Sequence, residues 1–287
     1  MIPTPIALAS DRRLDAFRNL KGQAGRADGT FVAESEIVLE RLFDSGIVIR
    51  AVLITPARAA RLAETLETSV AARTSHPVEV FVAEQRVIDD VVGYPLHRGV
   101  IALAERPKLP TVEALLGSSH TVVVLEGVMD PDNVGSVFRH AAGFGVDAVI
   151  LHGHTGDPLY RKTIRTSMGW TLSVPYARSA SEDPGIGALL ARHGFVSFAL
   201  TPARTAARLA DALDDVIRTG GPSARIAFLL GAEGPGLSDD LLSSADHRVR
   251  IPLADGVDSL NIATAAAIAL YALGHAQPSR LGSRRHP

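Results

Sequence analysis

The sequence predicts an α/β fold in two parts: a smaller N-terminal α/β sandwich, and a C-terminal α/β domain built on a parallel sheet. Short apolar runs alternate with helical segments of about ten residues along most of the chain. The run Thr121–Leu125 is continuously apolar, as expected for a strand covered on both faces of a parallel sheet. Two prolines among charges at Arg106–Pro110 indicate a linker between the two parts.

The N-terminal part is predicted to alternate strands and helices within residues 1–106, followed by a linker over 107–119. Strands are predicted at Thr30–Ala33, Val48–Ile54, Val78–Val82 and Gly99–Ala104. A helix is predicted from Glu34 to Asp44, ending at Ser45-Gly46. A second helix is predicted from Pro56 to Thr68, because proline suits the first turn of a helix.

The C-terminal domain is predicted to span residues 120–275, with a flexible basic tail over 276–287. Its predicted strands are Thr121–Leu125, Ala148–Leu151, Leu172–Pro175, Val196–Leu200, Ile226–Leu230 and Arg248–Ile251. Its predicted helices are Asp132–Gly143, capped by Asp132 or Asn133, then Tyr160–Met168, and finally Ser259–Leu273, ended by Gly274.

Composition limits the class of protein. The 287 residues are 46% hydrophobic, carry a net charge of −2 and include no cysteine, so we expect a globular protein without disulfides or thiolate metal sites. Neither a membrane span nor a signal peptide is found, and a cytoplasmic location is expected. The histidines lack a metal-ligand spacing, so no metal is predicted.

Basic residues are clustered despite the nearly neutral charge. The three clusters are Arg12, Arg13, Arg18, Lys21 and Arg26; Arg161, Lys162 and Arg165; and Arg280, Arg284 and Arg285. Such clusters can contact phosphates, although a run of charge is more often a solvated surface. The central cluster, Arg161, Lys162 and Arg165, is the candidate RNA-binding group because it lies between the motifs described next.

The first motif is the stretch Glu126–Arg139. A buried strand ends, the chain turns at Asp130-Pro131, and a helix begins. Arg139 is expected on a helix face with small neighbours, near the carboxyl end of a sheet strand, where ligands bind in open α/β folds. The alternative is an ordinary surface arginine.

The second motif is Gly231-Ala232-Glu233-Gly234, with Gly236 close behind. It follows a predicted strand, and its glycines allow backbone to approach a ligand closely. The spacing is not the G-x-G-x-x-G of dinucleotide-binding folds. A tight structural loop is the alternative.

The third motif is Ile251-Pro252-Leu253 followed, after a short polar loop, by Ser259-Leu260-Asn261. A strand stops at the proline and an alanine-rich helix follows. Unpaired N–H groups at the start of a helix can hold a polar ligand, whereas the alternative is a capped core helix.

Together these motifs resemble the SpoU family of SPOUT-class RNA methyltransferases. Asn133-x-Gly135-x-x-x-Arg139 resembles the first family motif, the glycine loop at Gly231 the second, and Pro252 with Ser259-Leu260-Asn261 the third. The resemblance covers roughly Thr121–Leu273 and includes a lesser signature at Arg165–Gly169. Phe31–Glu34 resembles, more loosely, the family's accessory RNA-binding domain, a ribosomal-protein-like sandwich.

The resemblance implies a trefoil knot in the C-terminal domain, and S-adenosylmethionine held by Gly231, Ile251 and Leu260. It also implies a homodimer that methylates a ribose 2′-hydroxyl of ribosomal or transfer RNA. Because guanidinium stays protonated, we expect Arg139 to bind phosphate and stabilise the developing alkoxide instead of acting as the base. The other expected catalytic residues are Asn133 and Asn261, which orient ribose and Arg139, Ser259, which hydrogen-bonds near the hydroxyl, and Glu233, which orients these groups.

Three other interpretations stay open on sequence alone. The chain could be a non-catalytic RNA-binding or ribosome-associated protein, which would have no need of S-adenosylmethionine. It could be a Rossmann-type nucleotide enzyme, although the glycine fingerprint is missing. Within the same family, a base atom could be methylated in place of the ribose.

Overall fold

The computed structural model describes residues 3–18, 20, 28–64, 78–179, 185–221 and 223–277. The chain forms two compact units. The first contains the chain up to Lys108 together with Pro158–Ser173, and the second contains Leu109–Asp157 and the chain from Val174 onward. The second unit therefore differs from the predicted continuous domain at 120–275, because an internal segment packs with the first unit.

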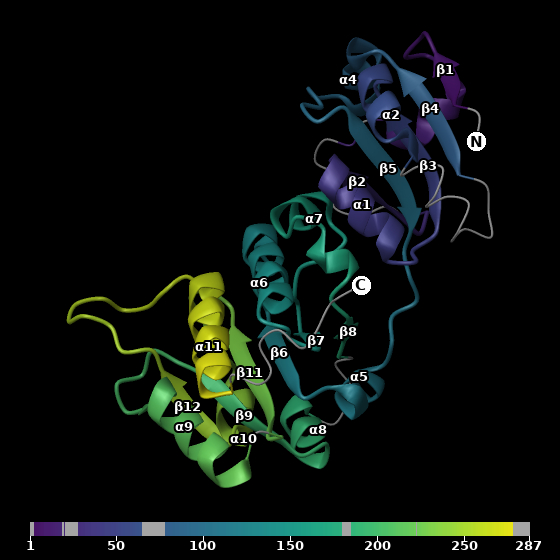
Figure 1. The fold of residues 1–287 in the computed structure, drawn as a ribbon. Helices are drawn as coiled ribbons and strands as arrows, with labels where there is room; N and C mark the ends of the chain where they lie inside the picture. Colours follow the sequence, from purple (N-terminus) through teal and green to yellow (C-terminus); the bar gives the residue numbers. More distant parts are fainter. Residues whose placement is uncertain are drawn as a thin grey trace. The chain divides into compact units, whose positions relative to one another are not determined.

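The described part of the first unit forms a five-stranded mixed sheet in the order β1-β4-β3-β5-β2 (Figure 1). Its strands are β1 (Thr4–Ile6), β2 (Thr30–Glu34), β3 (Ile49–Ile54), β4 (Glu79–Ala83) and β5 (Val100–Glu105). β5 runs antiparallel to β2 and β3, whereas β1 and β3 pair in parallel with β4. The predicted strands of this part are present, and none of their bounds is shifted by more than one residue.

Helices cover both faces of this sheet. They are η1 (Arg12–Phe17), α1 (Glu36–Asp44), α2 (Pro56–Arg61) and α4 (Gln85–Val92). One core lies between the sheet and α1, and another between the sheet, η1 and α4, so alternate strand residues enter opposite cores. The predicted helix extension to Thr68 lies outside the described residues, as do Lys21, Arg26 and the basic tail beyond Gln277.

The start of α1 is strained. Ser35, which precedes the helix, has φ 100° and ψ 155°, a backbone region that is essentially restricted to glycine. Ser35 is also buried, at 3% exposed. Ser35→Gly should therefore raise the melting temperature by a few degrees, since relief of roughly 1–3 kcal/mol exceeds the entropy cost of glycine. Thermal unfolding measures it. Ser45→Gly, at the other end of α1 with φ −72°, should lower the melting temperature instead.

The segment Pro158–Ser173 completes the first unit. It contains α7 (Arg161–Thr166) and η2 (Trp170–Leu172), and it contributes Leu159, Ile164 and Leu172 to the core beneath α1. Arg41 of α1 donates a hydrogen bond to the carbonyl of Met168 and lies 4.1 Å from the ring centroid of Trp170. These contacts explain why a segment from the middle of the sequence belongs to this unit.

The described part of the second unit is a seven-stranded sheet in the order β10-β12-β9-β11-β6-β7-β8, with every pairing parallel. Its strands are β6 (Thr121–Glu126), β7 (Ala148–His152), β8 (Tyr176–Arg178), β9 (Phe195–Leu200), β10 (Ala207–Arg208), β11 (Arg225–Gly231) and β12 (His247–Arg250). The parallel α/β fold predicted for this part is confirmed.

Two helical layers enclose this sheet. The helices are α5 (Val112–Ser118), α6 (Pro131–Gly143), α8 (Ile186–Arg192), α9 (Leu209–Gly220), α10 (Asp239–Ser244) and α11 (Ile262–Ala276). α6, α9 and α11 share one core with the sheet, and α5, α8 and α10 share the other (Figure 1). In β6, Val123 and Leu125 face the first core while Val122 and Val124 face the second, as the continuous apolar run predicted.

Several predicted boundaries are wrong for local reasons. The predicted strand Leu172–Pro175 is a 3₁₀ turn followed by a strand that starts after the proline, whose carbonyl accepts from Val149 N at 2.9 Å. Within the predicted linker, residues 112–118 form α5, whose buried side chains join the second unit. The first motif's helix is capped by Asp130, whose carboxylate accepts from the amides of residues 132 and 133, and not by Asp132 or Asn133.

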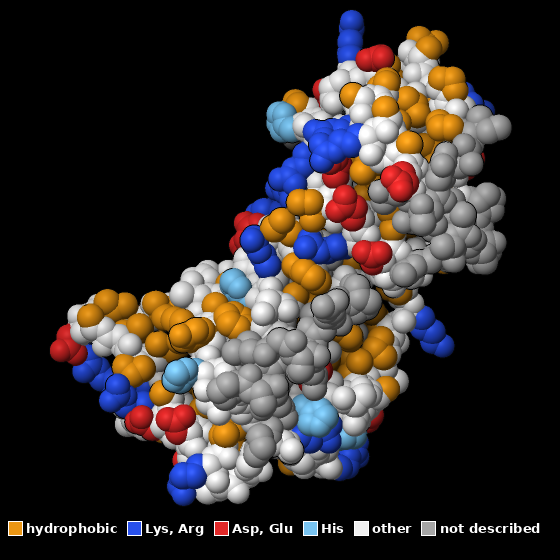
Figure 2. All heavy atoms as spheres, viewed as in Figure 1, with side chains coloured by type: hydrophobic (Ala, Val, Ile, Leu, Met, Phe, Trp, Pro, Cys, Tyr) orange, Lys and Arg blue, Asp and Glu red, His pale blue; other side chains and the backbone are white. Residues whose placement is uncertain are grey.

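The last helix is also displaced from its prediction. Asn261 caps α11, so Ser259 and Leu260 belong to the preceding loop, and the helix continues through the buried Gly274 to Ala276. Hydrophobic side chains gather over α11 and the loop that precedes it (Figure 2). Tyr271 of α11 is 65% exposed, and Val257 of the preceding loop is 51% exposed. No helix in the described part of the chain combines enough length and apolar character to cross a membrane.

Candidate active site

A cavity of about 590 Å³ lies beside the carboxyl ends of β9, β11 and β12. Its volume falls within the roughly 300–1,000 Å³ typical of small-molecule sites, and its position follows the rule for ligands in parallel α/β sheets. The second and third sequence motifs supply much of its wall. The lining residues include Leu200, Thr201, Leu230, Gly231, Glu233, Val249, Ile251, Leu253, Asp258, Ser259, Leu260, Asn261 and Ala265.

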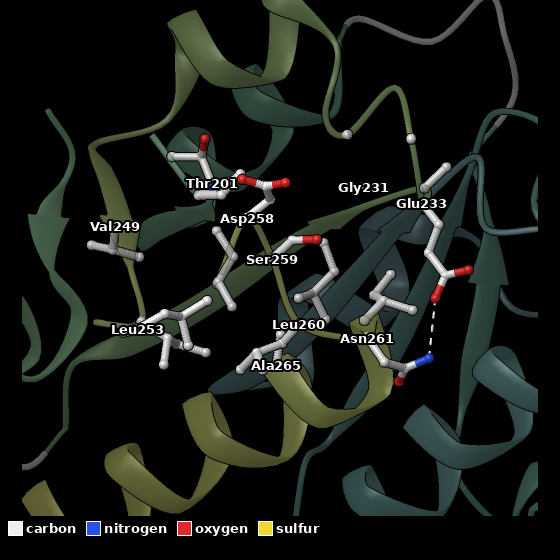
Figure 3. Close-up of a pocket in the computed structure, with 18 residues that line it drawn as sticks. Thr201, Gly231, Glu233, Val249, Leu253, Asp258, Ser259, Leu260, Asn261 and Ala265 are labelled. Carbon is white, nitrogen blue, oxygen red and sulfur yellow. Dashed lines mark hydrogen bonds between the residues drawn. The ribbon is translucent and has the colours of Figure 1, made fainter. Parts of the chain in front are cut away.

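The wall of this cavity is aliphatic, with polar groups at one side (Figure 3). Val249, Leu253 and Leu260 lie around the apolar part, above the first turn of α11. Glu233 and Asp258 are its charged lining residues, and no Lys or Arg lines it among the described residues. The cavity therefore presents negative charge and aliphatic surface to a ligand.

Asn261 joins the first motif to the other two. Its Nδ2 donates to Asn133 Oδ1 at 2.8 Å and to Glu233 Oε1 at 3.0 Å. Asn133, in the first turn of α6, is 8% exposed, and its amide oxygen is thus held by a partner in the interior. Three segments that are distant in the sequence meet at this amide.

The start of α11 is not an open site for a ligand. Oδ1 of Asn261 accepts hydrogen bonds from Ala263 N at 2.9 Å and from Thr264 N at 3.2 Å. The expectation that free N–H groups of this helix hold a polar ligand is therefore wrong for these two amides, because the capping side chain already uses them.

Gly231 has a structural reason to be glycine. A Cβ at this position would overlap the backbone of Gly236 and Leu237, where the loop folds back on itself. The loop is closed by Gly236 N donating to the carbonyl of Ala232 at 2.9 Å. We expected Gly231 to clear space for a ligand. The structure gives this glycine a different role, because the absence of a side chain at Gly231 lets the loop fold back and form the cavity wall.

Arg139 lies apart from the cavity. It is exposed on α6, does not line the cavity, and makes no hydrogen bond or ion pair within the described part of the chain. The next residue, His140, is half-buried, and burial together with the charge of Arg139 lowers its pKa. Of the predicted catalytic residues, Asn133, Glu233, Ser259 and Asn261 are therefore brought to one place and Arg139 is not.

The three residues of the predicted RNA-binding cluster have different surroundings. Nη1 of Arg161 donates to Glu34 Oε2 at 3.0 Å, and its guanidinium lies 4.4 Å from the ring centroid of Tyr94. Tyr94 also donates to Glu34 at 3.2 Å, and burial and this carboxylate raise its pKa, so the hydroxyl stays protonated. Arg161 is thus occupied inside the first unit, whereas Arg165 is exposed and Lys162 half-buried on α7.

These surroundings separate two arginines that the sequence grouped together. Arg161→Ala should destabilise the protein by about 1–3 kcal/mol, because it leaves the buried Glu34 without its cation. Arg165→Ala should leave the free energy of unfolding unchanged. It should reduce the steepness with which the logarithm of the RNA association constant falls with the logarithm of salt concentration by about one. Denaturant unfolding measures the stability of both variants, and RNA-binding titrations at several salt concentrations measure the salt dependence. If Arg165→Ala leaves the salt dependence of RNA binding unchanged, Arg165 does not contact the RNA phosphates.

Sequence reasoning missed several lining residues. Thr201 directly follows β9, and the rule that ligands bind at the carboxyl ends of parallel strands would have found it. Asp258 lies within the polar loop of the third motif but was given no role. Glu126, which ends β6 and begins the first motif, does not line the cavity and was likewise given no role.

Comparison with known proteins decides the family of the chain. A family model described as the SpoU rRNA Methylase family matches residues 120–271, just over half of the chain. The chain belongs to the SpoU rRNA methylase family. This SpoU family member also resembles an uncharacterized tRNA/rRNA methyltransferase of Mycobacterium tuberculosis, with 42% identity over 91% of this chain and 88% of the relative.

Two further comparisons extend along nearly the whole chain. The 23S rRNA (guanosine(2553)-2′-O)-methyltransferase RlmP of Bacillus subtilis is 25% identical over 93% of this SpoU family member and 98% of the relative. The crystal structure of an AdoMet-bound rRNA methyltransferase from Sinorhizobium meliloti has a TM-score of 0.78 and 24% identity, covering 95% of this chain and 97% of its own. The second likeness concerns the fold alone. The trefoil knot stays a prediction.

Proposed function

We propose that this SpoU family member is an S-adenosylmethionine-dependent RNA methyltransferase that modifies a ribose 2′-hydroxyl. The observation that carries the proposal is the junction at Asn261. There, a cavity built by the second and third motifs is hydrogen-bonded to Asn133 of the first. A set of unrelated structural loops would have no reason to meet in one small-molecule cavity.

The cavity fits the proposed cofactor chemically. S-adenosylmethionine carries a cationic sulfonium and an adenosyl group, which suit the two carboxylates and the aliphatic wall respectively. Gly231, Ile251 and Leu260 all line the cavity and would hold it by backbone and aliphatic contact. A dinucleotide would instead need partners for its phosphates. No Lys or Arg lines the cavity among the described residues, and Asn261 already occupies the amides of residues 263 and 264 at the start of α11, so both usual partners of a pyrophosphate are lacking there and the Rossmann-type alternative is disfavoured.

The residues of the chain would divide the work between positioning and charge stabilisation. When bound, S-adenosylmethionine supplies an electrophilic methyl group to a nucleophilic oxygen. The side-chain amide of Asn261 already makes all four of its hydrogen bonds within the chain, so it would hold Asn133 and Glu233 in place instead of contacting the ribose as expected from the sequence. Ser259 would hydrogen-bond near the 2′-hydroxyl. Arg139 would bind the phosphate beside that ribose and stabilise negative charge developing on the 2′-oxygen, whose proton leaves to phosphate or water.

Positioning is the larger part of this task. Fixing two reactants supplies roughly 7–11 kcal/mol, whereas a general base contributes about 10²–10⁴-fold in rate. A site without an obvious base is therefore compatible with catalysis. The relative RlmP, whose name states 2′-O-methylation of a guanosine in 23S rRNA, supports the ribose as the target.

We further propose a homodimer. Arg139 is exposed and outside its own cavity, so in this arrangement it would serve the cavity of the second subunit. The exposed face of α11 carries Thr264, Tyr271 and His275 at helical spacing, and the 65% exposed Tyr271 would supply apolar contact area to the second subunit.

Transfer of tritium from labelled S-adenosylmethionine to total cellular RNA tests the proposal. We expect label in RNA, and nucleoside analysis should recover it as a 2′-O-methylated nucleoside, with mapping then giving the RNA and the position. Label in a methylated base would overturn the ribose assignment. A chain that binds RNA but neither binds S-adenosylmethionine nor transfers its methyl group would be the non-catalytic RNA-binding protein.

A further inference from the structure

We propose that Glu126 is a positioning residue that clamps the glycine-rich wall of the cavity, Gly231 to Gly236, through Ser238. Glu126 does not line the cavity, so it would act on the ligand only through this loop. The inference rests on the proposed function for the identity of the ligand, S-adenosylmethionine.

Glu126 occupies a central place at the carboxyl edge of the sheet. It ends β6 and is paired in register with Gly231 of β11 on one side and with His152 of β7 on the other. The side chain of Glu126 is 15% exposed, whereas Ser238, its partner, is exposed. A carboxylate in that position must be satisfied by neighbouring donors.

Both oxygens of this carboxylate are used by one residue. Ser238 N donates to Oε2 of Glu126 at 2.7 Å, and Ser238 Oγ donates to Oε1 at 2.7 Å. Ser238 is also the N-cap of α10, where its Oγ accepts from Leu241 N at 3.3 Å. The contact therefore ties the end of the glycine loop to the end of β6 with two short, charge-assisted bonds.

The loop depends on such an anchor. Its start is fixed by the β11–β6 ladder, and its middle contains two glycines with positive φ, Gly234 at 92° and Gly236 at 75°. Glycine permits this path but adds freedom that must be lost when the loop is ordered. Leu237, directly after the loop, is buried in the core beside the sheet, and Ser238 is the next residue and the first with a side-chain hydrogen bond to a strand end. The bonds from Ser238 to Glu126 thus fix the direction in which the chain leaves the cavity wall.

His152 lies beside this carboxylate, on the side of β7. Nε2 of His152 lies 3.8 Å from Oε1 of Glu126, and Nδ1 of His152 lies 2.8 Å from Ser179 Oγ, just after β8. Residues at the ends of three strands and one helix thus converge on Glu126. This arrangement limits its rotamers, which a positioning residue requires.

Glu126→Gln tests the clamp with little change in shape, because the amide nitrogen that replaces one carboxylate oxygen cannot accept from Ser238. We expect the KM for S-adenosylmethionine to rise about tenfold, with the KM for RNA and the kcat at saturating cofactor within about twofold of wild type. Glu113→Gln, in an exposed 3.7 Å ion pair with Arg192 on the same unit, is the matched control and should change nothing.

Two further measurements separate positioning from a general loss of structure. Glu126→Ala should raise the KM for S-adenosylmethionine further, and adding Ser238→Ala should raise it no more than about twofold beyond that, because the two residues act through one contact. Amide hydrogen exchange of residues 232–238 in the ligand-free protein should accelerate at least tenfold in Glu126→Gln, while exchange in the core strands stays unchanged.

Each outcome bears on one of the two ideas. If wild type fails to bind S-adenosylmethionine, the proposed function fails, and the ligand-free exchange experiment still decides on the clamp. Unchanged exchange in the loop of Glu126→Gln overturns the clamp. The clamp is also overturned if the KM for S-adenosylmethionine and the KM for RNA rise equally while the melting temperature falls. That pattern would indicate a residue that only supports the fold.

Discussion

Arg139→Ala should reduce methyl transfer by a factor of 10³ or more while leaving the affinity for S-adenosylmethionine within about twofold. The rate loss corresponds to about 4 kcal/mol of transition-state stabilisation, the size expected for removing a charge that faces a developing oxyanion. Cofactor affinity should survive because Arg139 lies outside the cavity. Single-turnover methylation and calorimetric titration of the cofactor measure the two quantities. Transfer within tenfold of wild type would contradict the assignment.

The same position offers two sharper controls. Arg139→Lys keeps the charge but not the bidentate geometry, so it should also fail if phosphate is gripped by both guanidinium nitrogens. In a homodimer in which Arg139 serves the other subunit's cavity, mixing Arg139→Ala with a cavity-defective variant should restore about a quarter of wild-type activity. Absence of recovery in subunits shown to exchange would contradict the shared site.

Gly231→Ala should weaken binding of S-adenosylmethionine by a factor of 100 or more. The added methyl group would overlap the backbone of Gly236 and Leu237, so the loop that forms the cavity wall must move away from its present path. Backbone atoms cannot yield as a flexible side chain can, which is why a single carbon should have so large an effect. Calorimetric titration of the cofactor measures the change.

The control for this substitution is another glycine of the same unit. Gly117, in α5, has no atom within 4 Å of where its Cβ would stand. Gly117→Ala should therefore leave cofactor binding unchanged and should stabilise the helix by up to about 1 kcal/mol. Equal affinity for the cofactor in Gly231→Ala and wild type would show that the folded-back loop is not part of the binding wall.

The parallel sheet could be predicted because its strands carry an unambiguous pattern. In the run Val122–Leu125 every residue is apolar, and in the structure these residues alternate between two cores. The cavity was predictable for a related reason: two of the three motifs directly follow β11 and β12, whose carboxyl ends lie at one edge. The local apolar pattern predicts the strands, and the geometry of parallel sheets then predicts the edge at which the cavity lies.

The remainder depends on contacts that no local pattern contains. Glu34 and Arg161 are separated by 127 positions, and nothing near Arg161 indicates that its charge is neutralised in the first unit. The role of Gly231 depends on how the chain returns five residues later. Asn261 was predicted near the site, but its work as cap and as bridge to Asn133 emerges only when α6 and α11 are packed together.

The connectivity of Pro158–Ser173 constrains how this protein can be recombined. The chain passes from one unit to the other after Lys108, again after Asp157 and back after Ser173. A chimera that exchanged only the N-terminal stretch would set a foreign sheet against the native α7, with Leu159, Ile164 and Leu172 facing side chains that did not evolve beside them. The first unit is therefore not a detachable module. A substitution in the core of the first unit must therefore be matched by a substitution in Pro158–Ser173, which lies in the sequence between β7 and β8 of the second unit.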